Sequence, residues 1–147
     1  MFKADNPTAS IGLQFWNLYT KWNYEITLNL KPLGLTHTQF VILATTLWCE
    51  KEQTSPSQTK ISALTSLDKM TISKALKNLV EKNLVVKNKA PNDSRSFVLN
   101  LSETGQSLTL QAISVVEEID DKIFGSLGSA KKDKFLSLIL ELKSLET

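Results

Sequence analysis

The stretch of sequence that decides the predicted fold runs from residue 57 to residue 101 and is SQTKISALTSLDKMTISKALKNLVEKNLVVKNKAPNDSRSFVLNL. Two short amphipathic segments come first, and the second of them carries a lysine-rich face. Two runs rich in β-forming residues follow, 84–89 and 96–101, and a polar turn at 90–95 separates them. This order predicts a helix-turn-helix followed by a β-hairpin wing, a shape that suits duplex DNA.

The segment 69–82 has the periodicity of a helix with one buried face. Apolar residues recur on one side at about 100° per residue, and they are Ile72, Ala75, Leu76 and Leu79. Residues that point away from this side are Met70, Lys74, Lys77 and Glu81. Asp68 suits the N-cap position, and Asn83 can adopt the left-handed conformation that ends a helix. We therefore expect 69–82 to be the recognition helix.

Positive charge is concentrated in the stretch 57–101. It contains eight lysine and arginine residues against three acidic ones, a net charge of +5. The rest of the chain has nine basic and twelve acidic residues, a net charge of −3. A basic module in an acidic scaffold is typical of nucleic-acid binding. From charge alone, a lysine face that is merely solvated remains an open alternative.

Helices are also predicted on both sides of this stretch. A long helix with a broad apolar surface is expected within 8–30, and a capping box at 36–39 predicts a second helix that ends near Glu50. Ser55 is the expected cap of the third helix, with Pro56 in its first turn. The inward residues expected in that third helix are Ile61, Leu64 and Leu67.

The last two helices are expected to begin at Ser102 and Ser129. The apolar stripe of the first of them comprises Leu108, Val115, Ile119 and Ile123. The stripe of the second comprises Phe135, Leu138, Ile139, Leu142 and Leu145. The helices at both chain ends carry more apolar surface than the basic module can cover, so we expect them to pair two copies of the chain.

The predicted fold is mainly α with a small β-hairpin wing, an α+β class with four helices, two strands and two further helices. At 147 residues the chain suits one domain, 1–147. Within it, 36–101 is expected to form the DNA-binding winged helix-turn-helix core. The segments 8–30 and 103–145 are expected to be the dimerisation helices.

Composition excludes several classes of protein. The hydrophobic content of 41% and charged content of 22% are ordinary for a soluble globular protein. No apolar run approaches the roughly 20 residues needed to cross a bilayer, and the first ten residues lack the apolar core of a signal peptide, so a cytoplasmic location is expected. With one histidine, one cysteine, no glycine-rich phosphate loop and no metal-ligand cluster, we expect neither an enzyme nor a metal or other cofactor.

In element order over nearly its full length, the chain resembles the MarR family of bacterial transcription regulators (multiple-antibiotic-resistance regulators). The resemblance is most specific in three motifs, ISKALKNLVEKNLV at 72–85, PNDSR at 91–95 and LSETGQSL at 101–108. It implies a winged-helix homodimer that represses promoters and is released by a small ligand or by oxidation. The family usually has glycine where this chain has Asn83, and asparagine tolerates the same backbone conformation.

The residues that we expect to contact DNA are Ser57, Gln58, Thr59, Lys69, Met70, Thr71, Ser73, Lys74, Lys77, Asn78, Lys87, Lys89, Asn92, Asp93 and Arg95. Thr71 and Ser73 can hydrogen-bond base edges or phosphates, whereas Lys74 and Lys77 are expected to bind phosphate. The free N–H groups at 57–59, where the third helix begins, suit a phosphate.

The wing departs from the usual pattern of the family. Wing turns of the family often begin with Asp and carry two consecutive basic residues, and this chain has Ala90 and Ser94 at those places. Arg95 is therefore the single tip arginine, and we expect it to enter a narrow minor groove. The resemblance implies that Asp93 steadies the wing and its arginine.

Candidate effector-binding residues lie in the first two helices, and they are Trp16, Tyr19, His37 and Trp48. The resemblance implies a small aromatic, often anionic, ligand in a cleft between these helices and the winged module. The alternative is that the aromatic side chains form core and dimer packing, with His37 an ordinary exposed polar residue.

The predicted function is that of a sequence-specific regulator, a homodimer that represses transcription from a palindromic operator in double-stranded DNA and is released by a small aromatic ligand. One alternative is a redox-responsive regulator of the same fold that uses Cys49, although a single free cysteine is more often inert and buried. Another is a protein-interaction module whose basic face binds an acidic partner instead of DNA. RNA binding is disfavoured because no exposed sheet with aromatic residues is predicted.

Overall fold

The computed structural model describes residues 5–146 and confirms the predicted class and element order. Its helices and strands are α1 (Ile11–Leu30), α2 (His37–Lys51), α3 (Gln58–Thr65), α4 (Lys69–Glu81), β1 (Val85–Ala90), β2 (Asp93–Leu101), α5 (Glu103–Ile123) and α6 (Ser129–Lys143). Short 3-10 turns lie at Pro7–Ala9, Lys31–Leu33 and Gly125–Leu127. The two strands form one antiparallel hairpin.

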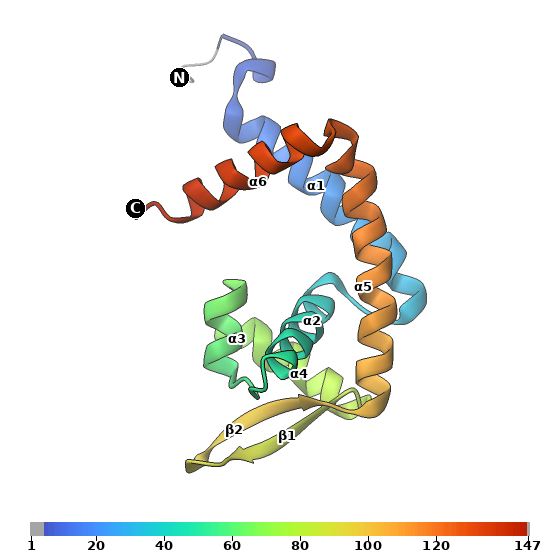
Figure 1. The fold of residues 1–147 in the computed structure, drawn as a ribbon, viewed down its shortest axis with the longest axis vertical. Coiled ribbons are helices and arrows are strands. Elements are labelled where there is room, and N and C mark those ends of the chain that lie inside the picture. The colour runs from blue at the N-terminus through green and yellow to red at the C-terminus, as the bar shows by residue number, and fades with distance from the viewer. Residues whose placement is uncertain (1–4, 147) are drawn as a thin grey trace.

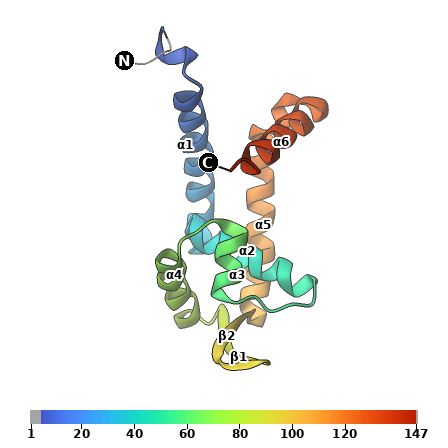
Figure 2. The same cartoon turned by 90° about the vertical axis from the view of Figure 1, so that its left-hand side faces the viewer.

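The molecule is elongated, with a winged helix-turn-helix module at one end and α1 and α6 at the other (Figure 1). Within the module, α2, α3 and α4 pack together beside the hairpin of β1 and β2. The long helix α5 runs from the base of the hairpin to α6. After a turn of 90°, α1 and α5 stand as two columns that rise from the module (Figure 2). α5 thus connects the winged module with the region that α1 and α6 form.

The buried core takes side chains from α1, α2, α3, α4, α5 and both strands. Its fully buried members include Ile26, Leu30, Leu43, Ile61, Ile72, Leu76, Leu79, Leu99 and Ala112. The inward face of α4 is therefore as predicted, with Ala75 half-buried beside it. In α3 the prediction is only partly right, because Ile61 is buried but Leu64 is 42% exposed. Leu67 lies two residues beyond the end of α3 and is half-buried.

Capping side chains define where the helices begin. Thr36 and Gln39 form the predicted reciprocal box, in which each side chain accepts the other's backbone N–H at 3.1 Å. The predicted cap of α3 is wrong by two residues, because the Ser57 hydroxyl, and not Ser55, accepts the N–H of Lys60 at 3.1 Å. Pro56 lies before this helix, and its carbonyl accepts the N–H of Leu99 at 2.8 Å. Pro56 therefore holds the wing strand and is not in the first turn of α3.

The buried face of α5 differs from the predicted stripe. The residues that it buries are Gly105, Thr109, Ala112, Val116 and Ile119, whereas Leu108, Val115 and Ile123 are half-buried. At the start of this face, Gly105 lies directly against the backbone of Leu84, which precedes β1. Thr109 is tolerated there because its hydroxyl donates to the carbonyl of Gly105 at 2.7 Å.

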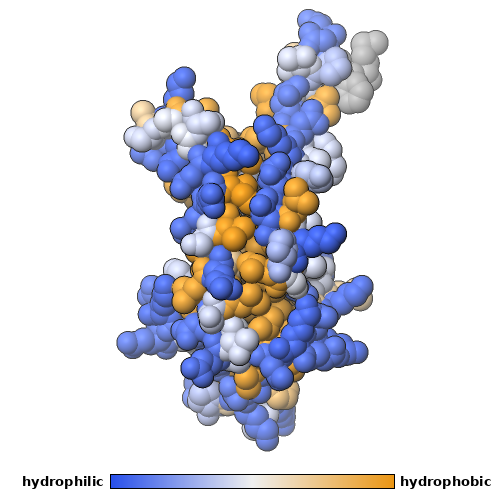
Figure 3. All heavy atoms as spheres, turned by 90° about the vertical axis from the view of Figure 1, so that its right-hand side faces the viewer, coloured by the Kyte–Doolittle hydropathy of each residue, from blue (hydrophilic) through white to orange (hydrophobic). Residues whose placement is uncertain are grey.

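Large apolar side chains remain exposed on α1 and α6. On α1 they include Ile11 (86% exposed), Phe15 (67%) and Trp16 (63%), and α6 buries no residue at all among those described. Figure 3 shows hydrophobic side chains gathered in a strip that runs along the molecule between two more polar columns. Within residues 5–146, no helix combines the length and the apolar character that a membrane span requires.

Candidate nucleic-acid interface

Asp68 is the N-cap of α4, as predicted. The carboxylate of Asp68 accepts the backbone N–H of Thr71 at 2.7 Å and the Thr71 hydroxyl at 2.9 Å. These hydrogen bonds, the backbone one above all, hold the pKa of the Asp68 carboxyl below its ordinary value. Asn83, with a φ of 59°, ends the helix in the left-handed conformation. Both boundaries of α4 therefore follow from local side-chain chemistry.

Seven of the fifteen predicted DNA contacts lie on α4. The residues of this set that are exposed are Lys69, Met70, Ser73, Lys74, Lys77 and Asn78, and Thr71 is half-buried. Met70 is 83% exposed, far more than a core methionine would be. Asn78 has a second role, because its Oδ1 accepts a hydrogen bond of 2.8 Å from Gln39 on α2. The carbonyl oxygen of the Asn78 side chain therefore helps to hold α4 against α2.

The beginning of α3 lies beside this side of α4. The Gln58 amide nitrogen donates to the Ser73 hydroxyl oxygen at 3.0 Å, so the predicted contacts at 57–59 and those of α4 form one surface. Ser57 and Gln58 are half-buried and Thr59 is exposed. Ser66, with a φ of 62°, reverses the chain between the two helices. A left-handed serine is uncommon at such a turn, and no sequence pattern predicts it.

The second strand of the wing hairpin is longer than predicted, and the turn between the strands is shorter. Pro91 and Asn92 alone connect the strands, and Asp93 already belongs to β2. Lys89 pairs with Phe97 but Ala90 pairs with Asp93, so the register shifts by three residues. The predicted turn at 90–95 is therefore wrong in extent, because residues 94–96 form an irregularity inside the strand.

Arg95 lies in the middle of this irregularity and is exposed. Its backbone N–H donates to Asp93 Oδ1 at 2.9 Å, and the Ser96 hydroxyl donates to the other oxygen of the same carboxylate at 3.3 Å. Asp93 thus binds the backbone of Arg95 and the side chain of Ser96. The other predicted wing contacts, Lys87, Lys89 and Asn92, are also exposed.

The base of the wing is held by three contacts that the sequence did not reveal. Glu50, at the end of α2, accepts the N–H of Leu101 at 2.7 Å. Asn100 donates to the Ser55 hydroxyl at 2.9 Å, next to the backbone bond between Leu99 and Pro56. These polar residues lie far apart in the sequence and have no shared spacing, so no local pattern indicates their partnership.

An aromatic row runs from α1 towards α6 and contains two of the candidate effector residues. The ring centroids of Trp16 and Tyr19 are 6.4 Å apart, and those of Tyr19 and Trp22 are 6.0 Å apart. Trp22 lies 6.4 Å from Phe124, which in turn lies 5.7 Å from Phe135. Trp16 and Tyr19 are exposed, whereas Trp22 is half-buried. Phe124 and Phe135 were not among the predicted site residues.

His37 joins this row and is not an ordinary exposed residue. Its ring meets that of Trp22 edge-on, with centroids 5.0 Å apart, and its Nδ1 is 2.6 Å from Asn23 Oδ1. The indole N–H of Trp22 donates to Asp120 on α5 at 2.8 Å. Burial lowers the pKa of His37 from its ordinary value, and the negative charge of Asp120 opposes this effect more weakly.

Trp48 lies apart from the other three candidates, near the end of α2. It borders an open groove whose lining also includes Cys49, Pro56, Lys60 and Val98. Trp48 is 54% exposed, whereas Cys49 is 1% exposed. The four candidate effector residues therefore do not form one site, because Trp48 faces the α3 side of the winged module.

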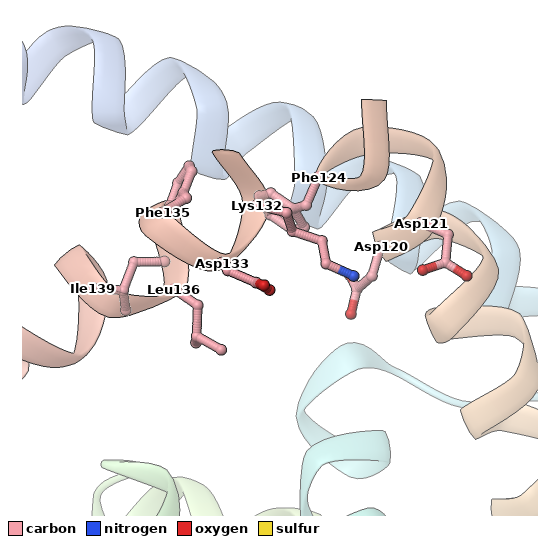
Figure 4. A pocket seen from close by; sticks show the side chains of 8 residues that line it. All are labelled: Asp120, Asp121, Phe124, Lys132, Asp133, Phe135, Leu136 and Ile139. Carbon is pink, nitrogen blue, oxygen red and sulfur yellow. The ribbon is translucent and has the colours of Figure 1, made fainter. Parts of the chain in front are cut away.

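A separate cavity of about 270 Å³ lies where α5 meets α6. The residues that line it are Asp120, Asp121, Phe124, Lys132, Asp133, Phe135, Leu136 and Ile139. Figure 4 shows the apolar side chains of Phe135, Leu136 and Ile139 on α6, with the Lys132 amine extended towards the two aspartates of α5. This cavity adjoins the aromatic row through Phe124 and is not in the cleft that the family resemblance implied.

Comparisons with known proteins agree with this geometry. A family model described as "Transcriptional regulator SarA/Rot" matches residues 26–112. The HTH-type transcriptional regulator YdcH of Bacillus subtilis (strain 168) is 29% identical over 140 residues, which cover 95% of this chain and 94% of YdcH.

Solved structures with the same fold include three regulators at low sequence identity. BpsR of Bordetella bronchiseptica has a TM-score of 0.85 at 20% identity, over 97% of this chain and 99% of that one. CouR of Rhodococcus jostii RHA1, with bound p-coumaroyl-CoA, has a TM-score of 0.85 at 18% identity, over 98% and 99%. A cysteine-to-serine mutant of MarR from E. coli, in complex with operator DNA, has a TM-score of 0.79 at 20% identity, over 98% and 100%.

The family model covers the last turn of α1, the whole winged module and about half of α5, which together are more than half of the chain. The family consists of transcription regulators, not of enzymes. The solved structures extend the likeness in fold to nearly the full length. The chain therefore belongs to the SarA/Rot family of transcriptional regulators and is a DNA-binding winged-helix regulator with the MarR-type fold.

Proposed function

We propose that this regulator is a cytoplasmic, homodimeric repressor. It binds a palindromic operator in double-stranded DNA, and a small aromatic ligand releases it. One observation carries the proposal: Lys74 and Lys77 on the outward side of α4 are exposed, and so is Arg95 on the wing. Lysines neutralise phosphates and release counterions, while side chains near the start of the helix contact base edges. Arginine suits the negative potential of a narrow minor groove.

The uncovered apolar surface of α1 and α6 supports a second copy of the chain as the partner. Leu136, Leu140 and Leu142 on α6 are each more than half exposed. A helix that buries none of its residues has little to stabilise it in water, because most helical stability comes from packing of an apolar face. The same surface on a second chain would cover it, as two-fold interfaces do. Two copies would then present two recognition helices to one operator.

Relatives support DNA and small molecules as partners. A structure of CouR, which is named a transcriptional repressor, contains a 23-mer DNA duplex, and CouR has also been solved with p-coumaroyl-CoA. The DNA binding of BpsR is described as regulated by 6-hydroxynicotinic acid. In this chain, the cavity between α5 and α6 joins the aromatic row at Phe124. Its apolar wall suits an aromatic ring, and the charges of its lining, three aspartates against Lys132, favour a ring without an anionic group.

Selection of bound duplexes from a random pool tests the DNA part of this proposal. We expect a palindrome with half-sites about one helical turn apart. Insertion of five base pairs between the half-sites should weaken binding strongly, because it rotates one half-site to the opposite face of the duplex. Equal binding to selected and random duplexes at moderate salt would contradict the proposal.

A charge on α6 tests the homodimer. The Leu142→Lys variant should dissociate in sedimentation experiments and lose operator affinity, because it places a charge in the proposed interface. Its fold should persist, since Leu142 is already 67% exposed in the single chain. Lys134→Glu on the same helix is the matched control, because Lys134 is exposed and lies outside the apolar residues. A Leu142→Lys protein that remains dimeric would exclude this surface.

A further inference from the structure

We propose that Thr71 is a hydrogen-bond acceptor towards DNA and selects a base that presents an amino group in the major groove, because Asp68 holds the Thr71 hydroxyl proton. This inference rests on the proposed function, in which the start of α4 lies in the major groove. It concerns the direction of a hydrogen bond, which decides which bases the helix accepts.

The direction follows from the partners of the Thr71 hydroxyl. A hydroxyl has one proton to donate and two lone pairs with which to accept. Thr71 Oγ1 donates to Asp68 Oδ2 at 2.9 Å, while Asp68 Oδ1 accepts the Thr71 N–H at 2.7 Å. An ionised carboxylate can only accept hydrogen bonds, so the proton between the two oxygens must be that of the Thr71 hydroxyl. Towards solvent or DNA, Thr71 therefore offers lone pairs alone.

Lone pairs select among the groups that DNA presents. Phosphate oxygens are acceptors, so Thr71 cannot bind the backbone while it donates to Asp68. In the major groove, the donors are the N6 amino group of adenine and the N4 amino group of cytosine, whereas guanine O6 and thymine O4 are acceptors. At the base position that it faces, Thr71 should therefore prefer adenine to guanine, or cytosine to thymine.

The charge of Asp68 acts in the same direction. Asp68 is exposed at the N-terminus of α4, where a helix would otherwise attract phosphate. A carboxylate at this place repels phosphate and attracts amino groups. The start of α4 is thereby suited to the base edges in the groove and not to the backbone.

Ser73, two residues further on, has the opposite arrangement. Its oxygen accepts the Gln58 amide N–H at 3.0 Å, which leaves its own proton free. Ser73 can therefore donate to a phosphate or to an acceptor base. Two hydroxyls on the same helix thus differ in direction because of their intramolecular partners, and Ser73 provides a matched comparison for Thr71.

The first test removes single amino groups from the selected operator, with purine in place of adenine or pyrimidin-2-one in place of cytosine at each half-site position. At one position, the wild-type protein should lose affinity about fivefold, as expected for one neutral hydrogen bond. Thr71→Val, which keeps the shape of the side chain, should lose almost nothing at that position. Ser73→Ala should respond to the missing amino group as the wild type does.

The second test reverses the direction of the hydroxyl. Asp68→Asn keeps a good N-cap, and its amide oxygen must still accept the Thr71 N–H. The amide nitrogen then donates to Thr71 Oγ1 and frees the hydroxyl proton. At the position found in the first test, the preference should change from adenine to guanine, or from cytosine to thymine. The Asp68→Asn, Thr71→Val double variant should show neither preference.

Three results would overturn the inference. One is a selective operator on which Thr71→Val responds to every missing amino group as the wild type does. Another is an Asp68→Asn protein that keeps the wild-type base at the position in question. In both cases the proposed function stands. Absence of any preferred sequence would overturn the proposed function together with the inference.

Discussion

The α-carbon of Gly105 lies directly against the backbone of Leu84, so that a Cβ at position 105 would overlap the Leu84 carbonyl oxygen. The same oxygen accepts the N–H of Ser102 at 3.0 Å, and the Ser102 hydroxyl caps α5 through the N–H of Gly105 at 2.9 Å. This close approach fixes the start of α5 against the start of the wing. It therefore sets the angle between the DNA-binding module and the helices proposed to pair two copies.

Gly105→Ala should destabilise the protein by about 3 kcal/mol, because backbone atoms must move to admit the methyl group. Gly12→Ala is the matched control, since nothing lies near the place of its Cβ in α1, and it should stabilise by about 0.5–1 kcal/mol. Urea unfolding at one fixed protein concentration measures both changes. A Gly105→Ala protein as stable as the wild type would contradict the described contact.

The single histidine of the chain, His37, should titrate below its ordinary pKa of 6.5, because burial disfavours its charged form. The folded protein then binds this proton more weakly than the unfolded chain. Stability contributed by neutral His37 is complete above about pH 6.5 and decreases as the pH falls from there to the pKa of the folded state. NMR titration of the Cε1 proton measures that pKa directly. A titration midpoint of His37 above pH 6.5 would contradict this prediction. The His37→Gln variant is the control, and its stability should not depend on the protonation of residue 37 between the pKa of folded His37 and pH 6.5.

Arg95→Ala should weaken operator binding by about 1–3 kcal/mol and leave the melting temperature nearly unchanged. Arg95 is exposed, and the bond that orders its backbone comes from its own N–H, which alanine retains. Ser94→Ala, at the neighbouring exposed position, is the control and should bind as the wild type does. Gel-shift titration compares the three proteins, and undiminished affinity of Arg95→Ala would remove the wing arginine from the interface.

Lys74→Ala should reduce the slope of log affinity against log salt concentration by about one unit, since one phosphate contact is lost. Lys131→Ala removes another exposed lysine, on α6 and far from the winged module, and should leave the slope unchanged. The measurement is a series of binding titrations between low and moderate salt. Identical slopes for the two variants would show that Lys74 makes no phosphate contact.

Local chemistry explains why much of the fold was predictable. The reciprocal caps of Thr36 and Gln39 and the N-cap of Asp68 each depend on residues three positions apart, so the sequence displays them directly. The alternation of apolar and basic residues in α4 likewise reflects one helix with one buried side. The predicted DNA contacts on α4 are therefore exposed as expected, except for the half-buried Thr71.

Contacts between distant segments explain what the sequence did not reveal. The buried face of α5 depends on how close Leu84 comes to Gly105, and no periodicity encodes that distance. The three-residue shift of the wing, the bond from Trp22 to Asp120, and the separation of Trp48 from the other aromatic residues have the same origin. Helical spacing places a residue on a face but does not identify the element that covers it.

We propose above all that two copies of this chain bind one operator, each through its own α4. Native mass spectrometry of the selected duplex tests this most directly, because it counts chains of 16.4 kDa on each duplex. We predict two chains on the intact palindrome and a large loss of the doubly occupied complex when one half-site is scrambled. A complex with one chain per duplex, equally stable on the scrambled site, would contradict the account.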